Sequence, residues 1–311
     1  MKARRQEMND LVQKTVELIE MALSRSYEDR TSLLMDGCHY AICSGGKRLR
    51  PLLVFATNDW LGGEMKQALP IALTVELIHN YSLVHDDLPE MDNDELRRGK
   101  ATVQKQYGHS LALLIGDALL SDCWLPILNS SEIPSSAKVA MMQTISDAIG
   151  SNGMIYGQFL DSISDIDKSD IIQLEKMHQL KTGRLIQAAA CAPFDMYQTN
   201  YFVEQRVRRF VKIFGLAFQV HNDLKDVLMN EEEAGKNVLH DQKLKKATYP
   251  SLLGISGALD LLESKIDEMQ LILEELTDHC PNSLLGRAIY EQALKWIDVQ
   301  EMREKYEERT C

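Results

Sequence analysis

The chain has 311 residues and a mass of 35.3 kDa, with 45% hydrophobic and 26% charged residues, which is typical of a globular protein with a sizeable core. Its formal net charge of −12 argues against a nucleic-acid-binding protein, which needs a net basic face. An acidic chain can still bind phosphate groups where its Lys and Arg residues gather at one place.

The six cysteines form no CxxC pair and no metal-ligand spacing, so we interpret them as reduced thiols of a cytoplasmic protein. The first 18 residues contain basic residues but no apolar stretch, and we expect no secretory signal there. The longest apolar run, LALLIGDALL, is interrupted by Asp117 and is too short to span a bilayer. We therefore expect a soluble, cytoplasmic protein with no integral membrane segment.

Apolar residues recur at helical spacing along the chain, as in segments 8–26, 137–154 and 258–280. Short turn-forming stretches separate such segments, for example SGGKRLRP at 44–51 and SSEIPSS at 130–136. No run of alternating residues indicates strands, and no low-complexity linker divides the chain. We predict a single all-α domain over residues 1–311, with ten or more helices around a central cavity.

The stretch 76–108 brings carboxylates and basic residues close together. A DDxxxxD pattern (86–92) follows an apolar helix, and two arginines (97–98) come directly after it. Carboxylates in one cavity need a compensating cation, and oxygen ligands without His or Cys suit a hard ion such as Mg²⁺. Arginine forks match phosphate oxygens. The alternative is a helix stopped by Pro89 and followed by a solvated acidic loop, but the order of parts favours a binding site.

A second acidic stretch, QVHNDLKDV, occupies residues 219–227. At helical spacing Gln219, Asp223 and Asp226 share a face, and Asn222 and Asp226 form an i, i+4 pair. From the residues alone, this stretch is either part of a metal site or a buried helix with a similar pattern.

Seven motifs give both stretches a common interpretation. LIHNYSLVHDDLPEMDNDELRRG resembles the first aspartate-rich motif of the trans-isoprenyl diphosphate synthases, in the bacterial short-chain form, and SGGKRLRP matches the family's isopentenyl diphosphate loop. GQFLD, KTGRLI, FGLAFQ, GK and KKATYP follow in the family's order and spacing, at 157–161, 181–186, 214–219, 235–236 and 245–250. The resemblance covers nearly the whole chain and implies the helical isoprenoid synthase fold, as a homodimer.

The resemblance implies an enzyme that joins an allylic diphosphate (dimethylallyl or geranyl) to isopentenyl diphosphate, head to tail, giving farnesyl or geranyl diphosphate. The difficult step is ionisation of the allylic C–O bond, where metal ions and cations stabilise the charge on the leaving group. Up to three Mg²⁺ ions per active site are implied, and Mn²⁺ could substitute. The implied metal ligands are Asp86, Asp87, Asp92, Asp223, Asp226 and, with an amide in place of a carboxylate, Asn222.

The resemblance also assigns the contacts of the two substrates. Arg97, Lys181 and Lys236 would contact the allylic diphosphate, and Thr182 and Gln219 would lie beside the reacting carbons. Together with Asp86 and Asp92, the residues Lys181, Thr182 and Gln219 form the implied catalytic set. For the acceptor diphosphate the implied contacts are Gly46, Lys47, Arg50, His79, Arg98 and Lys246, with Gly45 and Gly46 allowing a close backbone approach.

In this family the cavity floor below the first motif sets the product length. Tyr81 lies five residues before Asp86 and would place a large ring deeper along the helix, next to the small Ser82. In bacterial relatives this combination goes with a fifteen-carbon product. An aromatic residue on an apolar helix is also commonly part of the core, and a cavity floor is itself core.

The second motif departs from the family's DDxxD pattern. Asn222 replaces its first carboxylate, and Lys225 adds a cation where an aliphatic residue is usual. Three alternatives follow: ordinary elongation with a weaker metal site, irregular coupling or terpene cyclisation on the same fold, and a non-catalytic subunit of a heteromeric synthase. The acceptor loop argues against a cyclase, and the intact first motif argues against a purely structural subunit.

Overall fold

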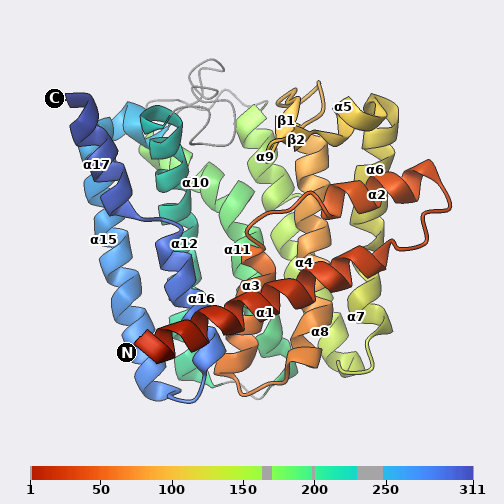
Figure 1. The fold of residues 1–311 in the computed structure, drawn as a ribbon, viewed down its shortest axis with the longest axis horizontal. Helices are drawn as coiled ribbons and strands as arrows, with labels where there is room; N and C mark the ends of the chain where they lie inside the picture. The colour runs from red at the N-terminus through yellow and green to blue at the C-terminus, as the bar shows by residue number, and fades with distance from the viewer. Residues whose placement is uncertain (1, 163–169, 198–199, 230–247, 311) are drawn as a thin grey trace. The chain divides into compact units, whose positions relative to one another are not determined.

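The computed structural model describes residues 2–162, 170–197, 200–229 and 248–310. The predicted all-α class is confirmed, because helices make up about 80% of these residues (Figure 1). The chain forms two compact units: Met1–Gln143, Ala192–Gln198 and Leu284–Ile289 make up unit 1, and the remaining residues make up unit 2. Each unit is described by itself below.

Unit 1 begins with a long helix and a series of helices that pack against one another. Its elements are α1 (Lys2–Ser26), α2 (Leu33–Ile42), α3 (Leu49–Trp60), α4 (Met65–Asp86), β1 (Leu96–Arg97), β2 (Lys100–Ala101), α5 (Val103–Tyr107), α6 (His109–Asp122), α7 (Leu125–Asn129), the first part of α8 (Ser135–Ile149), the 3₁₀ turn η2 (Ala192–Met196) and the start of α16 (Leu284–Lys295).

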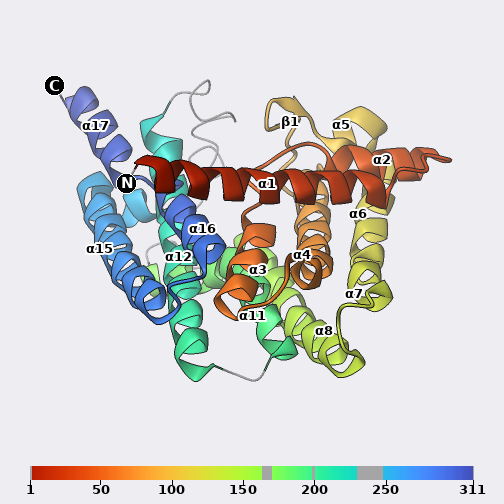
Figure 2. The same cartoon turned by 60° about the horizontal axis from the view of Figure 1, so that its bottom comes forward.

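The central helix of unit 1 is α4. A capping box starts it: Glu64 and Gln67 satisfy each other's backbone N–H groups at the first turn. Ile71, Val75 and Ile78 are fully buried and form one side of the core. Helix α3 packs along α4, and α1 crosses both of them (Figure 2). The acidic C-terminal end of α4 is therefore held by a well-packed helix.

A short β-hairpin follows α4, and the sequence pattern did not predict it. Leu96 pairs with Ala101 and Arg97 with Lys100, which leaves a two-residue turn. Both turn residues have positive φ, 55° at Arg98 and 75° at Gly99, as a type I′ turn requires. The strands are only two residues long, too short to show a period.

Unit 2 contains the end of α8, α9 (Met154–Ser162), α10 (Ile171–His178), the π-helical turn η1 (Gln179–Gly183), α11 (Arg184–Cys191), α12 (Tyr201–Leu228), α15 (Tyr249–His279), the end of α16 and α17 (Val299–Thr310). Helices α12 and α15 lie side by side over most of their length (Figure 1). The ring of Phe210 on α12 stacks on Tyr290 of α16 with centroids 4.1 Å apart, so aromatic packing anchors the core of this unit.

One stretch, His109–Asn129, is long and apolar enough to cross a membrane by length and composition alone, with 33% of its most apolar window buried. In the structure this stretch is two helices, α6 of 14 residues and α7 of five. Ile115, Gly116 and Leu119 of α6 are fully buried or nearly so, and α6 packs on α2 and α4. These contacts are those of an amphipathic helix at the edge of a protein core.

Candidate active site

The acidic end of α4 is closed by a tight backbone turn. Helix α4 ends at Asp86, three residues before Pro89, and the N–H of Asp92 donates to the carbonyl of Asp86 at 2.9 Å. Asp86 and Asp92 are both half-buried. The turn therefore brings the backbones of the first and last carboxylates of the DDxxxxD pattern next to each other.

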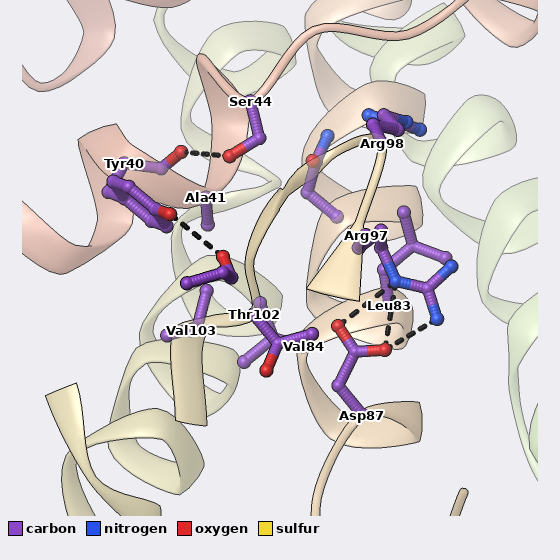
Figure 3. A pocket seen from close by; sticks show the side chains of 12 residues that line it. Tyr40, Ala41, Ser44, Leu83, Val84, Asp87, Arg97, Arg98, Thr102 and Val103 are labelled. Carbon is purple, nitrogen blue, oxygen red and sulfur yellow. Dashed lines mark hydrogen bonds and ion pairs between the residues drawn. The ribbon is translucent and has the colours of Figure 1, made fainter. Parts of the chain in front are cut away.

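The middle carboxylate, Asp87, has a different environment. It is buried, and Arg97 of the hairpin donates to both of its oxygens, with Nε 2.8 Å from Oδ1 and 3.0 Å from Oδ2 (Figure 3). Burial raises the pKa of Asp87, and the Arg97 guanidinium opposes that shift. The ion pair ties the hairpin to α4, and about a third of the Arg97 side chain (31%) stays exposed.

Positive charge accumulates around His79 on the same helix. Burial and the neighbouring guanidinium groups of Arg50 and Arg98 hold the pKa of His79 well below its usual value. Burial also lowers the pKa of Arg50 to about 10, and its Nε has no hydrogen-bond partner among the described residues. Cations held together without enough counter-charge create a site for an anion.

The loop before α3 lies against this cluster. Arg98 donates to the carbonyl oxygen of Gly45. Gly46 has a φ of 129°, which strains any residue other than glycine, and a Cβ added there would lie 2.6 Å from the guanidinium carbon of Arg98. Lys47, the next residue, is exposed. The structure thus brings the loop, Arg50, His79 and Arg98 together within unit 1.

A pocket lies between α2, α4 and the hairpin, all within unit 1 (Figure 3). On the α2 side the hydroxyl of Tyr40 donates to the carbonyl of Ala101 at 2.7 Å, and Ser44 Oγ donates to the carbonyl of Tyr40 at 2.6 Å. Arg97 and Arg98 line the pocket together with Asp87. It therefore borders the residues that carry the charge of this region.

The two residues predicted to set product length lie on α4. Tyr81 is 4% exposed, and its hydroxyl has no hydrogen-bond partner in the described part of the chain. Its ring meets the ring of His85 edge-on at 5.9 Å, and burial raises its pKa. Ser82 donates from Oγ to the carbonyl of His79 at 2.8 Å. The Tyr81 side chain is thus buried at the position that the sequence predicted for a large ring.

In unit 2 the motifs GQFLD and KTGRLI meet directly. Lys181 Nζ lies 2.7 Å from Asp161 Oδ2. A Cβ at Gly157 would lie 2.1 Å from the backbone nitrogen of Lys181, so α9 can pack on the π-helical turn only through glycine. Thr182 lies in that turn and is half-buried. The pairing of Lys181 with Asp161 was not predicted, although both residues lie in the quoted motifs.

On α12, the carboxylate of Asp223 is fully engaged. Gln219 Nε2 donates to Oδ1 at 2.8 Å, and the backbone N–H of Tyr249 donates to Oδ2 at 3.0 Å. Asp223 and Asp226 are both 2% exposed, whereas Asn222 and Lys225 are half-buried. The predicted shared face of Gln219 and Asp223 is therefore real, and it also holds the start of α15.

The described residues contain no group of three or more His, Cys, Asp or Glu side chains arranged to hold a metal ion. The oxygen donors at the end of α4, joined through the Asp86–Asp92 turn, fit a hard cation such as magnesium. Helix α12 offers a poorer site for such a cation, because Asp223 already accepts two hydrogen bonds and Asn222 is a neutral amide. Lys236 and Lys246 lie outside the described residues.

Two residues that shape this region, Arg48 and Glu76, are not predicted by the sequence pattern. Both are 2% exposed, and they form a buried ion pair with 2.6 Å between Arg48 Nη1 and Glu76 Oε1. Arg48 stands inside the quoted loop motif, but nothing in its local sequence distinguishes it from its basic neighbours.

The helical fold is that of an isoprenoid synthase. The polyprenyl synthetase family model matches residues 31–276, so the chain belongs to this family and is a prenyltransferase. It is 40% identical over 259 residues to a farnesyl diphosphate synthase of Micrococcus luteus, covering 83% of this chain and 89% of that one. It is 36% identical over 263 residues to a geranylgeranyl diphosphate synthase of Cyanophora paradoxa, covering 83% and 85%.

A solved structure adds a ligand-bound relative. A geranyltransferase from Helicobacter pylori, in complex with magnesium and isoprenyl diphosphate, matches with a TM-score of 0.80 and 29% identity. The match covers 92% of this chain and 96% of that one.

Proposed function

We propose that this protein condenses dimethylallyl or geranyl diphosphate with isopentenyl diphosphate, head to tail, to give farnesyl diphosphate. The observation that carries the proposal is the position of Arg50 and Arg98 beside His79 and the loop before α3, next to the carboxylate end of α4. The guanidinium groups of these two arginines would bind the acceptor diphosphate. The names of the relatives support the same reaction class.

At the allylic diphosphate, Asp86 and Asp92 are the proposed magnesium ligands, with Asp87 holding Arg97 in place. Magnesium, when bound, would neutralise charge on the departing pyrophosphate. Arg97 and Lys181 would donate hydrogen bonds to the same group, with Lys236 as a further contact, and Lys181 would be oriented by Asp161. Thr182 and Gln219 are proposed to lie beside the reacting carbons. The proton released at the end would pass to the pyrophosphate.

On α12 the proposed ligands of further magnesium ions are Asp226, Asp223 and the amide oxygen of Asn222. Since Asn222 brings no charge, we expect this helix to bind metal more weakly than a helix with a carboxylate there. Up to three ions per active site, and substitution by Mn²⁺, belong to the same proposal.

The acceptor diphosphate is proposed to lie in the loop before α3, contacted by Gly46, Lys47, Arg50, His79, Arg98 and Lys246. A neutral His79 can donate one hydrogen bond without adding charge, and its low pKa is consistent with that role. These contacts hold a diphosphate without a metal, so the acceptor would be bound without being ionised.

Product length is proposed to be fifteen carbons, with Tyr81 as the floor. The buried ring, whose hydroxyl has no hydrogen-bond partner among the described residues, fits a floor that closes a cavity. Tyr81→Ala should lengthen the product, which mass spectrometry of the hydrolysed alcohols would detect, while Tyr27→Phe, directly after the end of α1, is a control that keeps the floor. An unchanged fifteen-carbon product from Tyr81→Ala would reject this role.

We also propose a cytoplasmic homodimer made of one domain over residues 1–311. Apolar side chains lie exposed along α6 and α7, with Leu113 and Leu125 at 48%, Leu114 at 54% and Leu128 at 47%. A second copy that covered them would remove this apolar area from water.

The test is incubation of the purified protein with both diphosphates over a Mg²⁺ series. Elongation predicts linear ten- and fifteen-carbon alcohols after hydrolysis, and only when isopentenyl diphosphate is present. A cyclic or irregular product from the allylic substrate alone would overturn the proposal, and so would the absence of any product at every Mg²⁺ concentration.

A further inference from the structure

Arg48 differs from the other basic residues of its loop. Its side chain is 0% exposed and makes four hydrogen bonds. Nε and Nη2 donate to the two carboxylate oxygens of Glu20 at 2.7 and 3.0 Å, Nη1 donates to Glu76 at 2.6 Å, and Nη2 also donates to the carbonyl of Ile42 at 2.6 Å. Two carboxylates therefore neutralise this guanidinium, and it has no remaining charge to offer a substrate.

The backbone around Arg48 is strained. Three of the four residues 45–48 have positive φ: 84° at Gly45, 129° at Gly46 and 49° at Arg48. Glycine adopts such angles freely, but arginine does not. A side chain held in the left-handed region persists only where its surroundings fix it, and such residues gather at ligand sites. The four hydrogen bonds of Arg48 supply that fixation.

The loop is held from two sides. Arg48 anchors its C-terminal end to α1 through Glu20 and to α4 through Glu76, while Arg98 of the hairpin donates to the carbonyl of Gly45 at its other end. Between the anchors Lys47 is exposed, and two residues beyond Arg48 the Nε of Arg50 has no partner among the described residues. The basic stretch thus contains a fully paired Arg48, an exposed Lys47 and a half-buried Arg50 whose Nε has no partner among the described residues.

We propose that Arg48, with Glu20 and Glu76, is a positioning residue that fixes the loop 44–50 in the shape needed to bind the acceptor diphosphate. It acts through the loop and does not touch the substrate. The proposal rests on the proposed function for the identity of the acceptor. It also gives α1 a part in acceptor binding, because Glu20 lies on that helix, which crosses α3 and α4 (Figure 2).

The experiment compares Glu20→Gln and Arg48→Lys with a matched control, Glu268→Gln. Glu268 pairs with Arg209 at 2.7 Å between α12 and α15 and is similarly exposed, 29% against 37% for Glu20. Three quantities are measured on each folded variant: KM for each diphosphate, kcat, and hydrogen exchange of the peptide covering 44–50. Glu20→Gln removes charge from two hydrogen bonds, which should raise the acceptor KM about tenfold.

The expected result is a rise in the acceptor KM with the allylic KM and kcat within about twofold of wild type, together with faster exchange at 44–50. Arg48→Lys keeps the charge but cannot bond both carboxylates, so its effect should exceed that of Glu20→Gln. Glu268→Gln should change none of these quantities. Equal changes in both KM values, or unchanged exchange at 44–50, would overturn the proposal. Faster exchange with an unchanged acceptor KM would also overturn it, because the role would then be merely structural.

Calorimetric titration with inorganic pyrophosphate separates this proposal from the proposed function. Should the wild-type protein form no prenyl product, the condensation proposal fails, and pyrophosphate affinity replaces the acceptor KM as the readout. Weaker pyrophosphate binding by Glu20→Gln, with faster loop exchange, then supports the positioning role. Unchanged pyrophosphate affinity overturns it. The side chain of Glu20 is partly exposed, whereas that of Arg48 is fully buried. We therefore expect Glu20→Gln to fold, and it provides the test if Arg48→Lys does not fold.

Discussion

Two helices carry the aspartates of this protein, and their carboxylates are held in different ways. At the end of α4, Asp87 accepts hydrogen bonds from the guanidinium of Arg97, and Arg50 and Arg98 lower the pKa of His79 on the same helix. On α12, Asp223 accepts two hydrogen bonds from uncharged N–H groups. The same residue type therefore organises cations in one region and a helix start in the other.

The carboxylates of the two helices have different partners because a different element packs beside each helix. A helix start leaves N–H groups without partners, and α15 begins at Tyr249, whose N–H points at Asp223. Thr248 caps the same helix through its side chain. Asp223 thus stabilises the fold whatever it contributes to catalysis, whereas the hairpin supplies Arg97 as an ion-pair partner for Asp87 of α4.

The largest effect on activity is expected when a carboxylate at the end of α4 is removed. Asp86→Asn should lower kcat/KM about a thousandfold, because the magnesium ion that would neutralise the leaving group loses a carboxylate ligand, and should leave the unfolding midpoint in urea unchanged. Steady-state kinetics and urea denaturation measure both quantities. Near-wild-type turnover would contradict the role proposed for this end of α4.

The matching change on α12 should act on stability first. Asp223→Ala leaves the buried N–H of Tyr249 without its acceptor and should lower the free energy of unfolding by about 2–3 kcal/mol. Asp223→Asn keeps one carbonyl oxygen as an acceptor and serves as the intermediate variant. If Asp223→Ala unfolds at the wild-type urea concentration, the helix-start role is wrong.

A smaller effect is expected from restoring the carboxylate that α12 lacks. Asn222→Asp should lower the Mg²⁺ concentration for half-maximal rate about three- to tenfold, because ligand charge sets the affinity for a hard cation. Turnover measured across a Mg²⁺ series gives this value, and Lys225→Leu in the same series separates the effect of the nearby ammonium. An identical Mg²⁺ requirement would mean that Asn222 is not near the metal.

The smallest expected effect is the contribution of His79 to the pH dependence of stability. Its pKa is lowered in the folded protein, whereas an unfolded chain protonates histidine near pH 6.5. The unfolded state therefore binds more protons below that pH, and this group lowers the stability as pH falls through about 6.5.

NMR of the imidazole signals tests the low pKa of His79. They should not titrate between pH 7.5 and 6, and added pyrophosphate should raise the pKa by supplying negative charge. His79→Asn should flatten the corresponding part of the stability profile. Titration of His79 near 6.5 in the free protein would contradict the cationic environment assigned to it.

Sequence reasoning predicted the helical class and the acidic end of α4 because both depend on local patterns. The apolar periodicity of α4 and the helix break before Pro89 are visible within one turn of chain. The hairpin was missed, since its strands are two residues long and its turn, Arg98–Gly99, lacks the usual Asn-Gly signal. The pairing of Lys181 with Asp161 was missed because it joins side chains 20 residues apart.

The family, the helical fold class and the positions of the charged motifs are predictable from the chain, because they follow from residue order and periodicity. The pairing of the charged side chains is visible only in the folded protein, because it joins residues far apart in the chain. Arg48 and Arg50 are two residues apart, yet one is neutralised by Glu20 and Glu76 and the other keeps an unpaired Nε among the described residues. The partners lie 28 residues before and after Arg48 in the chain, so only folding could bring them to it.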